Sequence, residues 1–263
     1  MCGIVGCVAR EAPVVGALLG GLKRLEYRGY DSAGVAVLEH GELRIVREVG
    51  KLRRLEDVLQ GAPLLGRTGI GHTRWATHGK PSERNAHPHQ GGRGDVVAAH
   101  NGIIENYREL RDRLVARGHV FLSETDSEVI PHLIEDYYRG DFPDAVRRAL
   151  LDLEGSFAVA VVHRAHPDMV VGARKDSPLV VGLGEDRNFV ASDVAAVLEY
   201  TKRVIHMEDG DMAILTPEKA EEGGAKYVSK DELLATSDFV SIHLALSDRT
   251  RGLIGAADQA ARR

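Results

Sequence analysis

Cys2 directly follows the initiator methionine and begins an apolar run, Cys2–Ala9. Such a run is typical of a buried strand, whereas most chains begin with a frayed polar tail. If the methionine is removed, Cys2 carries both a thiol and the α-amino group of the chain. A nucleophile and a base then lie on one residue. The alternative is that Cys2 is a small buried hydrophobic residue, because free cysteine is among the most buried residue types.

Three further stretches concentrate polar side chains: HTRWATHG at 72–79, HNGII at 100–104 and ETDSE at 124–128. Each also has a purely structural interpretation. The first could be packing with a salt bridge, and the Asn-Gly pair of the second could be a turn. In the third, Thr125 and Glu128 fit a capping box, which leaves Asp126 as a charge that favours a helix start.

Composition and charge argue against several classes of protein. The chain has 263 residues, of which 28% are charged and 43% hydrophobic, as in a globular protein with a core. A net charge of −5 gives no reason to expect nucleic acid or an anionic membrane as a partner. No apolar stretch approaches the roughly 20 residues that span a bilayer, and no signal peptide is visible. Cys2 and Cys7 would point to opposite faces of one strand, so we expect no disulfide and a reduced, cytoplasmic protein.

Hydrophobic periodicity divides the chain into strands and helices. Helical spacing predicts helices over 14–26, 51–60, 106–117, 126–138, 142–153 and 193–200. Strands are predicted at 2–9, 68–76, 95–104, 119–122, 157–163, 168–175 and 178–184, with hairpins around His40-Gly41 and over 203–215. The polar loop 77–94 is long enough to suggest a function. The order of strands, helices and strands, without regular βαβ units, predicts an α+β fold of antiparallel sheets covered by helices.

The motifs together resemble a known family. The stretches CGIVG, LEYRGYDSAG, HTRWATHG, HNGIIEN and SETDSE are similar to the glutaminase domain of glucosamine-6-phosphate synthases (glutamine–fructose-6-phosphate aminotransferases). These are class II glutamine amidotransferases of the N-terminal nucleophile hydrolase type. The resemblance runs in order from Cys2 to about Pro217. It implies a four-layer αββα sandwich of antiparallel sheets with a short C-terminal appendage, and hydrolysis of L-glutamine to glutamate and ammonia.

The resemblance implies a role for each matching residue. Cys2 attacks the glutamine amide and forms a thioester, and its own α-amino group, with an unperturbed pKa of about 7.7–8.0, acts as the base. Asn101 and Gly102 supply the oxyanion hole. Arg74 binds the α-carboxylate of glutamine and Asp126 binds its α-ammonium group.

Other matching residues are expected around the substrate. Four of them belong to a loop that closes over bound glutamine in the family: Trp75, Thr77, His78 and Gly79. For His78 and His87 the choice between loop scaffold and substrate contact is left open. Arg28 and Tyr30 match supporting positions near the nucleophile. No cofactor and no metal are expected, because no carboxylate or cysteine clusters with these histidines in the sequence.

From about Thr216 the sequence departs from this pattern. The runs DFVSIHL and RTRGLI resemble part of the nucleotide-binding domain of D-2-hydroxyacid dehydrogenases. The tail lacks the glycine-rich turn that binds a pyrophosphate, and that family's catalytic arginine, glutamate and histidine are missing, which argues against an oxidoreductase. We therefore expect an amidotransferase domain over 2–217 and an atypical tail over 218–263, either a nucleotide-binding fragment or disordered, with the sugar isomerase domains absent.

Two functional hypotheses remain. The first is a glutaminase that, in the full synthase, supplies ammonia to fructose 6-phosphate to make glucosamine 6-phosphate. That sugar would be a partner only through the missing isomerase domain. The second is a truncated or chimeric domain that binds glutamine with little turnover. The presence of Cys2, Arg74, Asn101, Gly102 and Asp126 favours the first. A homo-oligomer is left open.

Overall fold

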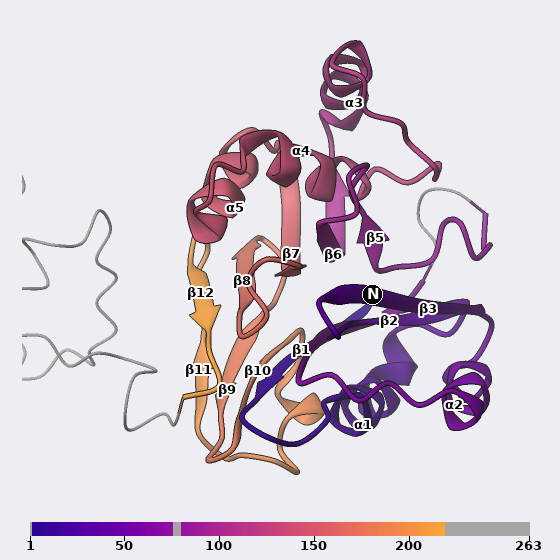
Figure 1. Cartoon of the computed structure of the whole chain (residues 1–263), viewed down its shortest axis with the longest axis vertical. Helices are drawn as coiled ribbons and strands as arrows, with labels where there is room; N and C mark the ends of the chain where they lie inside the picture. Colours follow the sequence, from indigo (N-terminus) through magenta and orange to yellow (C-terminus); the bar gives the residue numbers. More distant parts are fainter. Residues whose placement is uncertain (1, 76–79, 219–263) are drawn as a thin grey trace, which may run out of the picture. The chain divides into compact units, whose positions relative to one another are not determined.

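The described part of the chain is built from two β-sheets lying face to face with helices outside them (Figure 1). The computed structural model describes residues 2–75 and 80–218, so the predicted loop residues Thr77, His78 and Gly79 and the tail 219–263 lie outside the described residues. The strands are β1 (Gly3–Ala9), β2 (Ser32–Glu39), β3 (Glu42–Val49), β4 (Thr68–Arg74), β5 (His89–Gln90), β6 (Val96–Ile104), β7 (Gly155–His163), β8 (Val170–Lys175), β9 (Val180–Leu183), β10 (Arg187–Ala191), β11 (Val204–His206) and β12 (Met212–Leu215). One sheet has the order β11-β9-β10-β1-β4-β2-β3 and the other β12-β8-β7-β6-β5, and every neighbouring pair is antiparallel.

Strand β1 lies near the middle of the seven-stranded sheet and contributes to two layers of the core. Successive side chains of a strand point to opposite faces. Val5 and Cys7 therefore pack on the helix side of the sheet, whereas Ile4 and Val8 pack between the two sheets. Burial of both faces explains why this run is apolar throughout instead of alternating with polar residues.

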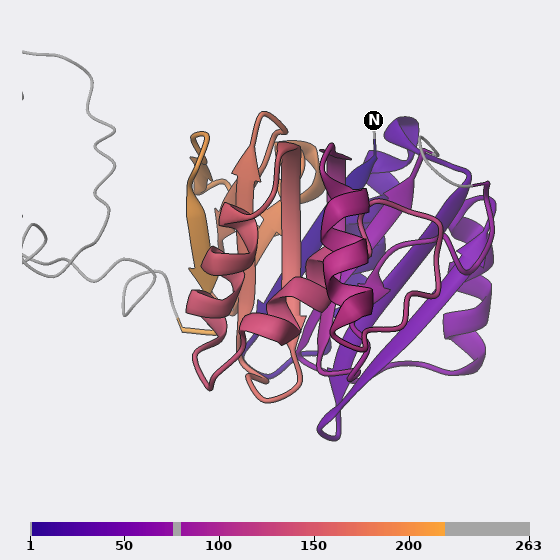
Figure 2. The same cartoon turned by 90° about the horizontal axis from the view of Figure 1, so that it is seen from above.

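The helices cover the two outer faces. They are α1 (Val15–Leu25), α2 (Leu52–Gly61), α3 (Tyr107–Ala116), α4 (Val129–Tyr137) and α5 (Phe142–Leu151), with 3₁₀ turns η1 (Glu26–Arg28) and η2 (Val194–Ala196). Helices α1 and α2 pack on the seven-stranded sheet, and α3, α4 and α5 share a core with the five-stranded sheet, over which Figure 2 shows them. The predicted four-layer αββα arrangement of antiparallel sheets is confirmed.

Residues 119–122 form no strand, contrary to the prediction. The backbone N–H groups of Leu122 and Ser123 donate to the carboxylate of Glu128, at 2.7 and 2.6 Å, and no strand pairs with this segment. The Glu128 carboxylate thus accepts the backbone hydrogen bonds that a neighbouring strand would otherwise accept. The alternation of apolar residues over 119–122 reports on burial and could not indicate that a side chain satisfies the backbone of this segment.

The alternative interpretation of Thr125 and Glu128 as a capping box of α4 is wrong. The helix begins at Val129 with Glu128 as its N-cap residue, and no side-chain hydrogen bond caps it. The Thr125 hydroxyl is instead within hydrogen-bond distance of His89 Nε2, at 3.0 Å. The acidic and hydroxyl side chains of this segment therefore organise the loop before the helix and leave the first helical turn uncapped.

The predicted hairpin over 203–215 is divided between the two sheets. Strand β11 pairs with β9 in the seven-stranded sheet, with Ile205 opposite Val181, whereas β12 pairs with β8 in the five-stranded sheet, with Ile214 opposite Val171. Met207, between the two strands, is buried in the core that joins the sheets. The helix expected at 193–200 is reduced to the turn η2.

Two smaller expectations concern the cysteines and membrane-spanning helices. Cys2 and Cys7 are both free thiols, as expected from their spacing on one strand. Within residues 2–75 and 80–218, no helix is both long enough and apolar enough to cross a membrane.

Candidate active site

A cavity of about 410 Å³ lies where Cys2, the end of β4 and the polar end of β6 come together. This volume is within the range of small-molecule sites. Of the predicted site residues that the structure describes, all but Tyr30 line it: Cys2, Arg28, Arg74, Trp75, His87, Asn101, Gly102 and Asp126. The three polar stretches of the sequence therefore meet at one site.

Strand pairing positions the thiol of Cys2. Gly3 pairs with Thr73, so Cys2 lies beside the end of β4, where the Trp75 N–H donates to Cys2 Sγ over 3.2 Å. Burial raises the pKa of the Cys2 thiol, although the hydrogen bond from Trp75 acts in the opposite direction. The thiol is therefore protonated at neutral pH, and it needs a base before it can act as a nucleophile.

The side chain of Asn101 is held at both ends. Its Nδ2 donates to the carbonyl oxygen of Cys2 over 3.0 Å, and its Oδ1 lies 3.0 Å from His72 Nε2. The same His72 nitrogen lies 3.1 Å from the carbonyl oxygen of His100. Because both partners are acceptors, Nε2 carries the hydrogen and donates to them. Burial lowers the pKa of His72 to about 3, so the ring is neutral.

Gly102 occupies a backbone position that only glycine fits. Its φ is +128°, and a Cβ atom there would lie 2.1 Å from the carbonyl oxygen of Ser156 on the neighbouring strand. The Asn-Gly pair is part of β6 and pairs with β7, so it is not the simple turn that the sequence left open.

Arg74 and Asp126 place opposite charges on the cavity wall. Both residues are buried. Asp126 Oδ2 accepts the Ile104 N–H over 2.8 Å, which fixes the carboxylate against the end of β6. A ligand that carries both a carboxylate and an ammonium group would find a partner for each charge here.

Four buried histidines lie side by side behind and beside the cavity: His72, His87, His89 and His100. The His87 ring stacks on His72 with centroids 4.2 Å apart and meets His89 at 4.4 Å. Burial lowers the pKa of His87 well below its usual range, with nearby rings adding to the effect. His87 thus lines the cavity and also belongs to its scaffold. Contact of His87 with the substrate stays a prediction.

Comparison with known proteins agrees with this geometry. A family model described as a glutamine amidotransferase domain matches residues 72–199. The glutamine–fructose-6-phosphate aminotransferase [isomerizing] of Aquifex aeolicus is 51% identical over 247 residues, or 92% of this chain. That of a Thermus thermophilus strain is 55% identical over 222 residues, or 84% of this chain. This chain belongs to the glutamine amidotransferase family. It spans 41% of the length of the first relative and 36% of the second.

Solved structures show the same fold for the amidotransferase domain. A glutamine phosphoribosylpyrophosphate amidotransferase from B. subtilis superposes with a TM-score of 0.69 at 25% identity, covering 82% of this chain and 47% of that one. A structure described as the allosteric regulatory enzyme of purine biosynthesis gives a TM-score of 0.71 at 26% identity, with the same coverage. Both support the predicted N-terminal nucleophile hydrolase architecture.

A second family model, the NAD binding domain of D-isomer specific 2-hydroxyacid dehydrogenases, matches residues 176–261. The match begins well before residue 216, where the sequence first shows that resemblance. Its described part, 176–218, contains β9 to β12, and all four strands are antiparallel members of the amidotransferase sheets. This part is therefore not a parallel nucleotide-binding sheet.

The two supporting residues of the amidotransferase domain have different positions. Arg28 lines the cavity and forms an ion pair with Asp193 at 3.1 Å. Tyr30 lies outside the cavity wall and packs edge-to-face on Trp75, with ring centroids 5.3 Å apart. Between them, Gly29 lets the chain pass close to β4, since a Cβ there would lie 2.7 Å from the backbone of Arg74.

Sequence reasoning missed several residues at this site. His72 and His100 lie inside the quoted motifs but had no assigned role, and their buried positions follow from strand pairing. Ser177 and Pro178, in the loop between β8 and β9, also line the cavity. No sequence signal pointed to them, because a loop of ordinary composition reaches the site only through the sheet topology.

Proposed function

We propose that the amidotransferase domain hydrolyses L-glutamine to glutamate and ammonia through a thioester on Cys2. The supporting observation is that the Cys2 thiol, the Asn101 amide and the opposite charges of Arg74 and Asp126 all border one cavity of about 410 Å³. An amino acid substrate needs this combination: a nucleophile and a hydrogen-bond donor at its reacting amide, and a charged partner for each group at its α-carbon.

The first step requires a free amine on Cys2, and hence removal of Met1. That amine, with an ordinary pKa of about 7.7–8.0, accepts the thiol proton directly or through a water. The sulfur attacks the side-chain amide carbon of glutamine, which becomes tetrahedral and carries an oxyanion. The raised pKa of the buried Cys2 thiol makes this base necessary.

The oxyanion is stabilised by Asn101 and Gly102. The Asn101 amide has two hydrogens, and only one is used by the Cys2 carbonyl oxygen. The second hydrogen and the Gly102 N–H are assigned to the oxyanion. The protonated α-amine then passes its proton to the leaving nitrogen as the C–N bond breaks. Ammonia departs, and water hydrolyses the thioester to glutamate, restoring the thiol.

We further infer that Trp75, Thr77, His78 and Gly79 contribute to glutamine binding, of which the last three lie outside the described residues. The relatives' name contains glutamine and fructose 6-phosphate, and we infer that the ammonia goes to this sugar. We place the reaction in hexosamine biosynthesis, in the cytoplasm. That transfer requires a sugar-binding part beyond the amidotransferase domain. Residues 2–217 are assigned to this domain and 218–263 to a separate tail.

Glutamate release by the full chain tests the hydrolysis, with intact mass reporting whether Met1 is removed. We expect turnover, and capture of the thioester by hydroxylamine as a γ-glutamyl hydroxamate. Cys2→Ala should abolish both. Cys7→Ala is the matched control, because Cys7 is buried on the helix side of β1, away from the cavity.

Two results would contradict the proposal. Turnover that survives Cys2→Ala would exclude Cys2 as the nucleophile. Glutamine binding without turnover in a chain that has lost Met1 would favour the second hypothesis, a binding domain without activity.

A further inference from the structure

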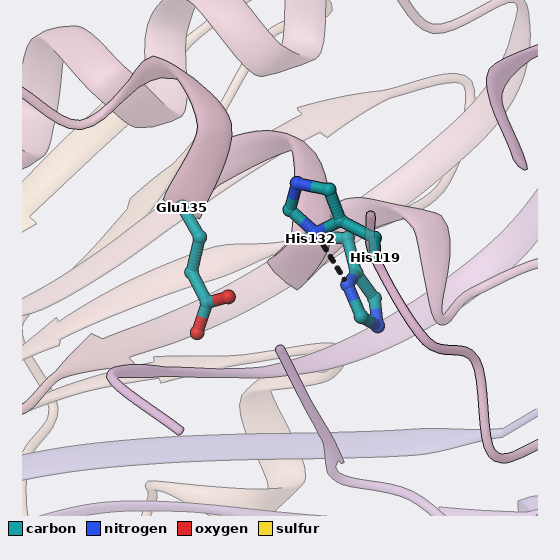
Figure 3. Close-up of side chains that lie close together, drawn as sticks. All are labelled: His119, His132 and Glu135. Atoms are coloured by element: carbon teal, nitrogen blue, oxygen red, sulfur yellow. Dashed lines mark hydrogen bonds between the residues drawn. The ribbon is translucent and has the colours of Figure 1, made fainter. Parts of the chain in front are cut away.

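Two histidines and a glutamate outside the catalytic cavity lie close together (Figure 3). His132 and Glu135 are three residues apart on α4, so they lie on the same face of the helix. His119 comes from the segment after α3. One potential ligand atom from each of the three residues lies within 4.8 Å of the other two. None of the three lines the catalytic cavity.

The two imidazole rings approach each other through their Nδ1 atoms. His119 Nδ1 and His132 Nδ1 are 2.9 Å apart. The opposite nitrogen of each ring faces a carboxylate: His119 Nε2 lies 4.0 Å from Asp136 Oδ1, and His132 Nε2 lies 3.7 Å from Glu128 Oε1.

With its hydrogen on Nε2, on the side of the carboxylate, each ring has a lone pair on Nδ1 for a ligand. At 2.9 Å the two Nδ1 atoms share a hydrogen bond when one of them carries the hydrogen, and a cation that binds both nitrogens replaces that hydrogen. The same pattern, a carboxylate behind each histidine and a lone pair in front, is how proteins orient histidine ligands toward a metal ion.

Glu135 is held in place as the third donor. Its two oxygens accept the backbone N–H groups of Arg93 and Asp95, at 2.9 and 3.1 Å. Gly91 packs directly on the carboxylate, since a Cβ there would lie 2.4 Å from Glu135 Cδ. Each carboxylate oxygen keeps a further lone pair for a ligand.

We propose that His119, His132 and Glu135 form a Zn²⁺ site. Two imidazole nitrogens and one carboxylate oxygen are a donor set that zinc accepts, with a fourth position for water. Zn–N bonds of about 2.0–2.1 Å in tetrahedral geometry set the two nitrogens about 3.3 Å apart, so the rings need to separate by a few tenths of an ångström. The Glu135 oxygen, which lies within 4.8 Å of a ring nitrogen of each histidine, moves closer to these nitrogens when the ion binds. The site was not expected from the sequence, because its residues span two elements and match no metal motif there.

A metal ion at this site would stabilise the local structure. A bound ion ties the segment after α3 to α4, whose His132 faces Glu128, the carboxylate that holds the N–H groups of Leu122 and Ser123. The ion therefore stabilises the loop that leads to Asp126. This site is independent of the proposed glutaminase reaction, and its test does not rely on activity.

The test uses the full chain, purified without a histidine tag and stripped with a chelator. We expect it to take up one equivalent of Zn²⁺, measured by elemental analysis after desalting. Its melting temperature should rise with the logarithm of free zinc, as for a ligand that binds the folded state. Co²⁺ should give the visible absorption of a four-coordinate site.

Variants locate the ion. His119→Gln should lose the equivalent of zinc and the melting shift, and His119 lies at the edge of the core, where a glutamine can be accommodated. Glu135→Gln should weaken binding strongly. His206→Gln, which alters an exposed histidine on β11, is the matched control and should retain both signals.

The proposal fails if the stripped chain takes up no zinc, or if His119→Gln, shown to be folded by circular dichroism, still binds one equivalent. In the first case the two rings share a hydrogen bond, with one Nδ1 protonated. In the second case the ion lies elsewhere. If Glu135→Gln does not fold, zinc binding by His119→Gln alone tests the proposed site.

Discussion

His72 Nε2 donates a hydrogen bond to Asn101 Oδ1 over 3.0 Å, from a ring that is fully enclosed by protein. This contact determines which end of the Asn101 amide faces the cavity. With Oδ1 bound behind it, the NH₂ group is directed toward Cys2. The histidine is therefore a positioning residue for the group that we assign to the oxyanion hole, and it is not one of the residues that line the cavity.

Replacing His72 by leucine should remove this orientation. We expect kcat to fall by about tenfold to a hundredfold, because a misplaced catalytic group loses that much rate, while KM for glutamine changes little. His72→Gln, which retains an N–H donor, should recover part of the rate. Steady-state kinetics on both variants provide the measurement. Equal loss in the two variants would indicate a packing role only.

Gly102→Ala tests the backbone at the same site. We expect a loss of unfolding free energy of at least about 1–3 kcal/mol, because the residue would be forced into a left-handed conformation and against the Ser156 oxygen. Gly16→Ala is the control: its Cβ would meet nothing within 4 Å, in helix α1, and should stabilise by about 0.5–1 kcal/mol. Urea unfolding measures both. Equal effects would refute the strain at Gly102.

The two charged residues of the cavity should control substrate affinity. Asp126→Asn and Arg74→Lys are expected to raise KM for glutamine by about tenfold or more, since a charged hydrogen bond is worth roughly 1.5–3 kcal/mol. Arg24→Lys, on an exposed ion pair with Glu199, should leave KM unchanged. Initial rates over a range of glutamine concentrations decide the question, and an unaltered KM in both cavity variants would reject these contacts.

Stability should decrease as the pH falls below about 6.5. Burial lowers the pKa of His72 and of His89 to about 3, and the positive charges of Arg74 and Arg47, respectively, act in the same direction. The folded state thus binds fewer protons than the unfolded state between pH 6.5 and 3, so acid favours unfolding by up to about 1.4 kcal/mol per pH unit for each ring. Unfolding free energies at pH 7.5, 6.5 and 5.5 test this.

The exposed His206 gives the control for that pH series. His206→Gln should leave the slope of stability against pH unchanged, because His206 is exposed on β11 and lies outside the group of buried histidines. A flat profile in the parent chain between pH 6.5 and 5.5 would show that the buried histidines take up protons without cost.

Removal of residues 219–263 tests the assignment of the tail. We expect the shortened chain, ending at Glu218, to retain its glutaminase rate, since the cavity is lined only by residues between Cys2 and Pro178 among those described. Glu218 is kept because its carbonyl oxygen accepts a hydrogen bond from Asn188 on β10. A large loss of rate in the soluble shortened chain would show that the tail takes part in catalysis.

The sequence alone determined the strands, helices and turns that depend on a local pattern of residues. The apolar run of β1, the helical spacing of α1 and the turn at His40-Gly41, where both residues have positive φ, all appear in the structure. Several residues around the cavity could also be predicted from the sequence. A cysteine at position 2 and an Asn-Gly pair are recognised from the local sequence, without knowledge of which residues lie near them in space. The layered antiparallel class followed from the order of these elements.

Only the tertiary structure decided which distant segments meet. It separated β11 from β12, replaced the expected strand at 119–122 by bonds to Glu128, and brought His119 to His132. In each case the outcome depends on backbone groups or side chains supplied by another part of the chain. Periodicity reports which face of an element is buried, whereas the partner that buries it is set by packing of the whole domain.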